Sequence, residues 1–574
     1  MPDVAPPARP SDRLLAWVDR YRYWVFGLLL AAYAAGFNGH WRLEPDSALY
    51  LTIGRNLVEG NGYTFLGKDH RLAYPGVPLL FAGLFKAFGT NSLLPHLTMM
   101  WLMGVACLGL VYRLFLLHAG RPTAVLMTLG VGLSRVFYRY TFELLTDLPF
   151  LLGVTAFLVG YEAVFYRRQH AGHDGEPAAG ESAAGYRFDI RAVWFDGVLM
   201  LVGLGLAVAT RPSMWALLAA AVGAAAWSLL ALVLRAVRER RVRRIHVVAV
   251  AVHLLVALVV VLAVSLFYLR DPRQQKFDPS SPGSTNYVEE DRLFHLGSEQ
   301  VGQMVARAGR GLAQVLDDGL SEAAFGTPIK IPGLRNYPGA LLGAVVVTAG
   351  VLLARERPLW GFWVLATVLM VTQVPKPVDR YFLPVIPVTV YAWWRTVRWA
   401  EGFALRRWGP RPAAGAFLLL FALGGVPNVA ELVGFVYEQR QPNFLTHYKK
   451  GRGAAEGRYA TAYAMAAMID RQPERSGKPQ AADTMWVLVP EKYGRVMTFL
   501  TRRYCVEPTP YTALEPRRRT PEPGKVRGQT VYAVEPADEA VAAWAAPRRC
   551  VVDPTPVDRA AAGGWTLHRV FTLP

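Results

Sequence analysis

The sequence contains little cysteine and little charge. Its 574 residues include three cysteines, Cys107, Cys505 and Cys550, and only 18% of the residues are charged, whereas typical soluble proteins carry about 25%. Three cysteines supply neither a disulfide framework nor a metal-ligand spacing, although Cys505 and Cys550 can pair if their domain lies outside the cytoplasm. A chain of this length also exceeds what one hydrophobic core accommodates. The composition therefore excludes a single soluble domain.

The motifs of many soluble enzymes are also lacking. The sequence has no Walker loop, dinucleotide fingerprint, nucleophile elbow or zinc-binding HExxH in the context that each requires. His40 and His70 flank one loop without a metal-ligand spacing. The acidic run Glu289–Asp291 indicates a solvated loop, with divalent-cation binding as the alternative. We therefore expect that no cofactor is required, and no metal site is indicated.

Apolar sequence is what the chain has in abundance. Hydrophobic residues make up 53% of it, and its mean hydropathy is +0.22. The formal net charge of +19 would suggest nucleic-acid binding in a soluble protein. Here the basic residues cluster in short loops between apolar runs, as in RAVRERRVRR at 235–244, and this is the pattern of cytoplasmic loops. We therefore predict a membrane protein without a nucleic-acid partner.

Apolar runs of about 20 residues predict a mainly helical, polytopic protein with about eleven transmembrane helices. These runs lie near residues 24–36, 93–117, 122–139, 148–166, 192–210, 213–234, 246–269, 338–354, 359–375, 381–398 and 412–436. The basic loops between them fall on one side of the membrane, which predicts a cytoplasmic N-terminus. We place the protein in the cell (inner) membrane.

The runs divide the chain into three parts. Residues 1–23, rich in proline and arginine, predict a disordered cytoplasmic tail. For the first apolar run, 24–36, the alternative to a membrane span is a signal peptide cleaved near Ala34. The transmembrane domain covers 24–436, with external loops at 39–92 and 270–337. Residues 437–574 follow on the external side. Their pattern predicts a small extracytoplasmic α/β domain, with helices at 454–470 and 491–501 and strands at 485–490, 530–534, 549–552 and 566–573.

Charged residues directly after the first apolar run are the first candidate site. Glu44, Asp46, Arg55 and Glu59 fall within one helical pattern that Gly60-Asn61-Gly62 ends. Asp46 suits a helix N-cap. A carboxylate at the membrane boundary can also take a proton from an acceptor hydroxyl or amine. The two interpretations are compatible, because a helix start holds a side chain firmly.

A second group of charges begins at the end of the third apolar run and continues beyond it. Arg135, Arg139, Glu143 and Asp147 recur every four residues, so a single helix would place them on one face. They either form intrahelical ion pairs or line a polar cavity at the external side.

Two arginines lie at the external ends of later spans, in Thr210-Arg211-Pro212 and in the segment KPVDRY that begins at Lys376 and contains Arg380. Arginine at such a place is either an interfacial side chain that reaches the water layer or a ligand for phosphate oxygens.

In their order and sidedness, these features resemble the GT-C glycosyltransferases, and most closely their protein O-mannosyltransferase and aminoarabinose-transferase branch. The resemblance rests on the first-loop carboxylate, the segment YPGVPLLFAGLFKAFG at 74–89, an E-x-x-x-D from Glu143 to Asp147, the TRP triplet and the late DRYFLP. It covers roughly residues 20–400 in layout. It implies that 74–89 forms an interfacial helix in the first external loop.

The resemblance implies transfer of a sugar from a polyprenyl-phosphate donor to a lipid, protein or glycan acceptor at the extracytoplasmic face. Asp46 would be the catalytic base. Glu143, Asp147 and Glu44 would orient the acceptor or the sugar. The donor phosphate would be bound by Arg380, Arg211, Lys376 and Arg55. Membrane lipids are further expected partners, and the branch implies no required metal.

Two other functions compete with this one. A transporter or flippase of a lipid-linked or small polar substrate also places charges near the membrane, but the sequence shows no inverted repeat or paired broken helices. A scaffold that binds partners through its external domain leaves the one-sided carboxylates and arginines unexplained. The spatial test is whether Asp46 and the two arginines meet.

Overall fold

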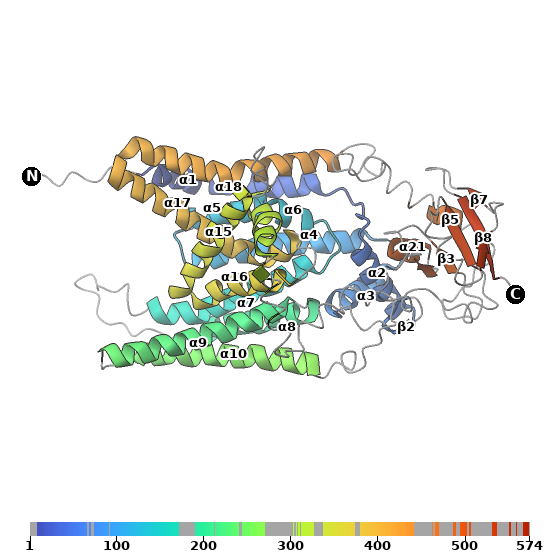
Figure 1. Ribbon diagram of the computed structural model, residues 1–574, viewed down its shortest axis with the longest axis horizontal. Coiled ribbons are helices and arrows are strands. Elements are labelled where there is room, and N and C mark those ends of the chain that lie inside the picture. The colour runs from blue at the N-terminus through green and yellow to red at the C-terminus, as the bar shows by residue number, and fades with distance from the viewer. Residues whose placement is uncertain are drawn as a thin grey trace, which may run out of the picture.

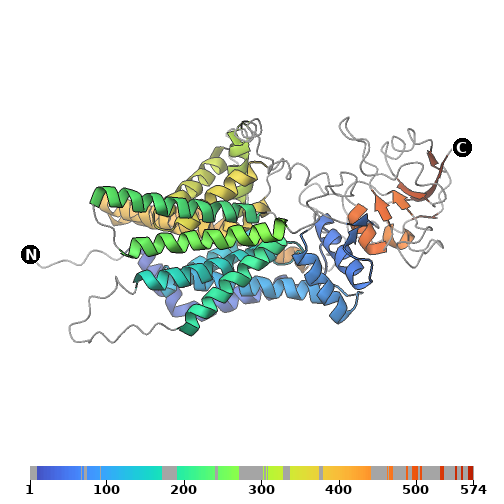
Figure 2. The ribbon, with the colours of Figure 1, turned by 90° about the horizontal axis from the view of Figure 1, so that it is seen from below.

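The computed structural model describes most of the chain. It covers residues 9–440 with gaps at 66–67, 70–73, 91, 171–189, 212, 240–243, 270–301, 303–305, 307, 310, 327–336 and 374–378, and beyond them residue 462 and the segments 465–469, 486–488, 494–501, 504–506, 531–535, 550–552, 558–559 and 566–572. Long helices run side by side along the molecule, and a small sheet lies at the end opposite the N-terminus (Figures 1 and 2).

A helix occupies each apolar run of the sequence. The bundle contains α1 (Pro10–Gly36), α4 (Leu94–Leu116), α5 (Arg121–Leu133), α7 (Asp147–His170), α8 (Ile190–Thr210), α9 (Met214–Glu239), α10 (Arg244–Leu269), α15 (Tyr337–Leu352), α16 (Pro358–Val371), α17 (Ile386–Trp408) and α18 (Pro410–Gln439). Within the described residues, α4, α18 and most of α7 and α9 are long and apolar enough to cross a membrane. The total of eleven crossings stays a prediction.

Two of the expected spans are interrupted. Ser134 separates α5 from the short helix α6 (Arg135–Tyr140), and the run at 381–398 begins as the 3₁₀ helix η4 (Asp379–Val385) before α17. Residues 270–301 of the predicted second external loop lie outside the described residues. Further along that loop, the π-helix η2 (Val315–Ser321) and α14 (Glu322–Phe325) pack against η4.

The first helix begins earlier than expected. It starts at Pro10, so the prediction of a disordered tail is wrong from that residue on. Buried Glu401 of α17 accepts hydrogen bonds from the backbone N–H of Ser11, at 3.0 Å, and from its hydroxyl. Arg398 adds an ion pair to Asp12 at 2.8 Å. These contacts satisfy polar groups at the helix start and order a segment that by composition alone resembles a flexible tail.

Small residues let α7 and α8 approach closely. A Cβ built on Gly203 of α8 would lie 2.5 Å from the backbone nitrogen of Phe157 and 2.6 Å from the carbonyl oxygen of Gly153, both on α7. Real Cβ atoms do not approach backbone so closely, so the two helix axes can lie this near only because the position is glycine. This is a packing device frequent between membrane helices.

Replacing Gly203 with leucine is therefore expected to force α7 and α8 apart and to destabilise the protein by about 1–3 kcal/mol, the usual range for overpacking. Thermal unfolding of the purified protein in detergent measures the effect. Gly205→Leu is the matched control, because a Cβ at Gly205 of the same helix meets no atom within 4 Å. Equal unfolding temperatures for the two variants would contradict the prediction.

The segment that the sequence predicts to be the first external loop lies at the sheet end of the bundle. It contains α2 (Pro45–Val58), strands β1 (Thr64–Phe65) and β2 (Lys68–Asp69), and α3 (Gly76–Phe88). The predicted end of α2 is confirmed, since Gly60 and Gly62 adopt positive φ of 80° and 73°, which glycine does without strain. A short helix at 74–89 is also confirmed as α3, which packs against α2.

The C-terminal region forms a mixed sheet. Its strands are β3 (Trp486–Leu488), β4 (Tyr504–Val506), β5 (Val531–Glu535), β6 (Cys550–Val552), β7 (Asp558–Arg559) and β8 (Thr566–Thr572), and the helix α21 (Gly494–Thr501) connects β3 to β4. The order is β4-β3-β5-β8-β6, with β7 also beside β8. The four predicted strands are present, whereas β4 and β7 were not predicted. The predicted helix at 454–470 lies largely outside the described residues.

The sheet order keeps two cysteines apart. Cys505 lies on β4 and Cys550 on β6, at opposite ends of the strand path with three strands between them. Neighbouring strands are about 4.8 Å apart, whereas a disulfide requires Cα atoms within about 7 Å. The pairing that the sequence left open is therefore excluded within one chain.

Candidate active site

Asp46 lies in the first turn of α2. Glu44 is the N-cap residue and Pro45 the first helical residue, so the interpretation of Asp46 as the cap is wrong by two positions. The turn is held by Ser47, whose hydroxyl donates to the Glu44 carbonyl oxygen at 2.7 Å and accepts from the indole N–H of Trp41 at 2.9 Å. Asp46 is thereby fixed at the helix N-terminus, where the helix dipole favours a negative charge.

Two arginines from distant parts of the chain contact this carboxylate. Both terminal nitrogens of Arg380, on η4, lie 3.3 Å from Oδ2 of Asp46. Nη1 of Arg495, on α21, lies 2.8 Å from Oδ1. The expected meeting of Asp46 and Arg380 is thus observed across 334 residues of sequence. Arg495 was not predicted, because no motif around it distinguishes it from the other arginines.

The arginines control the ionisation of the site. Burial raises the pKa of Asp46, but the charges of Arg380, Arg495 and, farther away, Arg211 outweigh it and hold that pKa below its ordinary value. Burial lowers the pKa of Arg380, yet Asp46 and nearby tyrosines keep it well above the usual range. The site thus contains a carboxylate and fixed guanidinium charges at neutral pH.

A buried phenol completes the immediate surroundings. Tyr50 follows Asp46 by one helical turn, and burial together with the Asp46 charge raises its pKa to about 12. It therefore remains protonated at neutral pH. The ring of Tyr381 contacts two cations, with its centroid 5.0 Å from the guanidinium carbon of Arg211 and 5.5 Å from that of Arg380, within the range of cation–π attraction.

The second carboxylate of the E-x-x-x-D motif is used for an ion pair. Asp147, at the start of α7, pairs with Arg211, which follows α8, and their side chains are only 2% and 8% exposed. Since Arg211 also contacts the ring of Tyr381, this pair connects the start of α7 and the end of α8 to η4. Arg211 and Asp147 therefore lie beside the Asp46 group.

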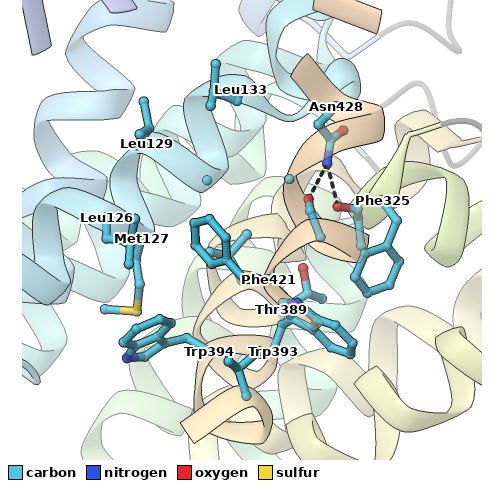
Figure 3. A pocket seen from close by; sticks show the side chains of 16 residues that line it. Leu126, Met127, Leu129, Leu133, Phe325, Thr389, Trp393, Trp394, Phe421 and Asn428 are labelled. Carbon is cyan, nitrogen blue, oxygen red and sulfur yellow. Dashed lines mark hydrogen bonds between the residues drawn. The ribbon is translucent and has the colours of Figure 1, made fainter. Parts of the chain in front are cut away.

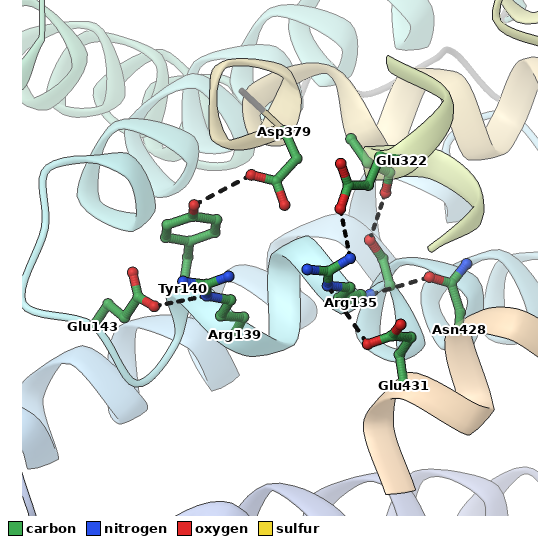
Figure 4. Close-up of polar contacts among 10 residues, drawn as sticks. Arg135, Arg139, Tyr140, Glu143, Glu322, Asp379, Asn428 and Glu431 are labelled. Atoms are coloured by element: carbon green, nitrogen blue, oxygen red, sulfur yellow. Dashed lines mark hydrogen bonds and ion pairs between the residues drawn. The ribbon is translucent and has the colours of Figure 1, made fainter. Parts of the chain in front are cut away.

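Glu143 belongs to a neighbouring cluster. Its Oε1 accepts from Nε of Arg139 at 2.9 Å (Figure 4) and from Nη1 of Arg42 at 3.4 Å. The hydroxyl of Tyr140 donates to Asp379, the residue before Arg380, at 3.3 Å. The expectation of four charges on one helix face is wrong, because α6 ends at Tyr140 and α7 begins at Asp147. The chain turns between them, so Arg139 and Glu143 still pair with each other, whereas Arg135 and Asp147 pair with residues of other elements.

The remaining predicted residues lie elsewhere. Arg55 contacts α21: its Nη2 donates to the carbonyl oxygen of Phe499 at 2.8 Å, and its guanidinium carbon lies 4.0 Å from the centre of the Phe499 ring. Glu44 is the N-cap of α2. Lys376 lies outside the described residues. Among the residues that the structure describes, no three His, Cys, Asp or Glu side chains come together as metal ligands.

An apolar cavity opens among α5, α14, α17 and α18 (Figure 3). Its walls are chiefly aliphatic and aromatic, and Asn428 closes one end by donating to the carbonyl oxygens of Ala324, at 3.0 Å, and Gly424, at 3.1 Å. The backbone N–H of Arg135 donates to the Asn428 side chain at 3.1 Å. Because Arg135 begins α6 and Tyr140 ends it, this one short helix links the cavity to η4 (Figure 4).

Comparison with known proteins shows which solved structures have a similar fold. No family model matches the sequence, and no curated protein matches it. The solved structure of ArnT from Cupriavidus metallidurans in the apo state is similar, with 15% identity, a TM-score of 0.50 and coverage of 96% of this chain and 98% of that one. The same protein bound to undecaprenyl phosphate gives 13% identity, a TM-score of 0.47 and the same two coverages.

A second similar structure is the oligosaccharyltransferase of Archaeoglobus fulgidus tethered with an acceptor peptide. It shows 15% identity and a TM-score of 0.47, over 96% of this chain and 75% of that one. ArnT and this oligosaccharyltransferase are both GT-C glycosyltransferases. The structural likeness to apo ArnT covers nearly the whole of both chains, and the chain therefore has the fold of the GT-C superfamily.

Proposed function

We propose that this protein is a membrane glycosyltransferase that moves a sugar from a polyprenyl-phosphate donor to a lipid, protein or glycan acceptor at the extracytoplasmic face of the cell (inner) membrane. The observation that carries the proposal is the group formed by Asp46, Arg380 and Arg495. It joins a carboxylate, which can accept a proton, to two guanidinium groups suited to phosphate oxygens.

The chemistry requires both kinds of group. An acceptor hydroxyl or amine attacks the anomeric carbon of the donor and passes its proton to Asp46. The bond between that carbon and the phosphate oxygen breaks, and its electron pair leaves with the oxygen. The phosphate thereby changes from a singly charged diester to a monoester that can carry two charges, and fixed arginine charges stabilise the charge that develops. Because the lipid phosphate is already a reasonable leaving group, one carboxylate suffices and we propose that no metal is required.

Neighbouring residues have supporting roles in this proposal. Arg211 supplies a further positive charge, which contacts the same Tyr381 ring as Arg380 and acts on Asp46. Glu143 and Asp147 orient the acceptor or the sugar, and Glu44 stands two residues before the base. The apolar cavity suits a hydrocarbon chain, and we assign it to part of the polyprenyl chain. ArnT, whose fold this chain has, is described with undecaprenyl phosphate bound.

The test is reconstitution of the full chain in lipid vesicles with radiolabelled polyprenyl-phosphate sugars and extracts that contain candidate acceptors. We expect loss of the donor and the appearance of label in an acceptor fraction, in amounts that depend on the protein. If label instead crosses the bilayer while the donor remains intact, the protein is a transporter of a lipid-linked substrate and the proposal is wrong.

A further inference from the structure

Helix α21 brings an arginine from the C-terminal sheet region to the carboxylate of the first external loop. Arg495 and Phe499 are four residues apart, so they lie on the same face of α21. That face meets α2, since Arg495 contacts Asp46 while Phe499 accepts a hydrogen bond from Arg55. Figure 1 shows α21 directly beside α2.

The docking of α21 also reaches the turn that holds Asp46. The Phe499 ring packs edge-on against Trp41, with centroids 5.1 Å apart, and the Trp41 indole N–H donates to Ser47 in the first turn of α2. Arg495 is therefore placed by two further contacts of its own helix, both made by Phe499. Its position beside Asp46 follows from packing and does not depend on the ion pair alone.

The charges of this group are not balanced. One carboxylate, Asp46, faces two guanidinium groups that cannot lose their protons, so the three side chains carry one net positive charge. They are partly open to solvent, with 27% of the Asp46 and Arg380 side chains and 20% of the Arg495 side chain exposed. An anion can therefore reach both arginines, and a phosphate diester would bring the group to neutrality.

We infer that Arg495 is a phosphate-binding residue: together with Arg380 it holds the phosphate of the polyprenyl donor and of the departing polyprenyl phosphate, and Asp46 occupies the two guanidinium groups until that phosphate arrives. This inference rests on the proposed function and assigns one half of the phosphate site to the C-terminal region. Because Arg495 lies on α21, phosphate binding and the docking of α21 onto α2 stabilise each other by the reciprocity of linked equilibria.

The experiment compares two lipids in nanodiscs that contain the full chain: polyprenyl phosphate, and the polyprenol of the same length, which lacks the phosphate. We expect Arg495→Gln to weaken binding of polyprenyl phosphate by about 10- to 100-fold, the range for losing a charge-assisted hydrogen bond, and to leave polyprenol binding unchanged. Arg495→Lys should fall between the two, because lysine keeps the charge but loses the forked geometry.

Hydrogen exchange gives the second readout. In the wild type, residues 494–501 should exchange more slowly when polyprenyl phosphate is added and not when polyprenol is added. Arg440→Gln is the matched control. Arg440 also joins distant parts of the chain, through a 2.7 Å hydrogen bond to the Ala35 carbonyl oxygen, but it does not contact Asp46. This variant should bind both lipids as the wild type does.

Three results would overturn the inference. If the wild type binds polyprenyl phosphate and Arg495→Gln binds it equally well, Arg495 does not bind the phosphate; if the variant instead loses both lipids equally, Arg495 is a structural residue. In both cases the proposed function stands. If the wild type does not prefer polyprenyl phosphate to polyprenol, the proposed donor is wrong, and the role of Arg495 fails with it.

Discussion

Replacing Asp46 with asparagine is expected to lower the rate of sugar transfer by about 100- to 10,000-fold, the usual contribution of a positioned general base. Asparagine has nearly the same size and can remain in the first turn of α2, but it cannot accept the acceptor proton. The rate of donor consumption in reconstituted vesicles, at saturating donor, measures the loss.

Donor binding separates this chemical effect from damage to the site. In Asp46→Asn no carboxylate at position 46 competes with the phosphate for Arg380 and Arg495. Polyprenyl phosphate should therefore bind to this variant at least as tightly as to the wild type. Asp19→Asn is the control, because Asp19 is 45% exposed and its ion pair, among the residues that the structure describes, is with Arg22 on its own helix. Transfer by Asp46→Asn at a rate close to that of the wild type would exclude Asp46 as the base.

Replacing Asp147 with asparagine is expected to destabilise the protein by about 3–5 kcal/mol, because it leaves the buried guanidinium group of Arg211 without its counter-charge. Arg211→Met should lower the free energy of unfolding by a similar amount, because it leaves the buried carboxylate of Asp147 without its counter-charge. Removing both charges together, in an Asp147→Leu, Arg211→Met double variant, should cost less than either single replacement. Thermal unfolding in detergent, monitored by tryptophan fluorescence, tests this ranking of the three variants by stability.

The control for the effect of burial is an exposed ion pair in another part of the bundle. Arg395 and Glu356 form an ion pair whose side chains are 44% and 57% exposed, and such surface pairs contribute about 0–1 kcal/mol. Glu356→Gln should therefore unfold close to the wild-type temperature. A loss in Asp147→Asn no larger than that in Glu356→Gln would show that burial does not govern the strength of the Asp147 pair.

Hydropathy and turn chemistry predicted much of the fold, because both act over short stretches of sequence. Each apolar run is a helix, and Gly60 and Gly62 end α2 where expected. The sequence could not show the turn at 141–146, because the spacing of Arg135 and Asp147 fits one continuous helix equally well. The same limit applies to α1, whose first turn is ordered by Glu401 from a helix close to 400 residues later.

Some residues of the candidate site could be predicted from the sequence, and others only from the structure. Asp46 and Arg380 stand out in the sequence because each is a charge beside an apolar run. Arg495 lies in a short helix of a region with many arginines, and only the packing of Phe499 on Trp41 and Arg55 brings it to Asp46. Arg55 illustrates the converse: its place near the membrane suggested phosphate binding, whereas its guanidinium group contacts Phe499.

The contact between Asp46 and Arg495 spans 449 residues, and this has a consequence for biosynthesis. Ribosomes add about 5–20 residues each second, so roughly 20–90 s separate the synthesis of Asp46 from that of Arg495. During this interval the nascent protein holds a carboxylate and most of its helices but only part of the arginine pair. The protein therefore becomes competent only when its last region has been made and has folded against its first loop.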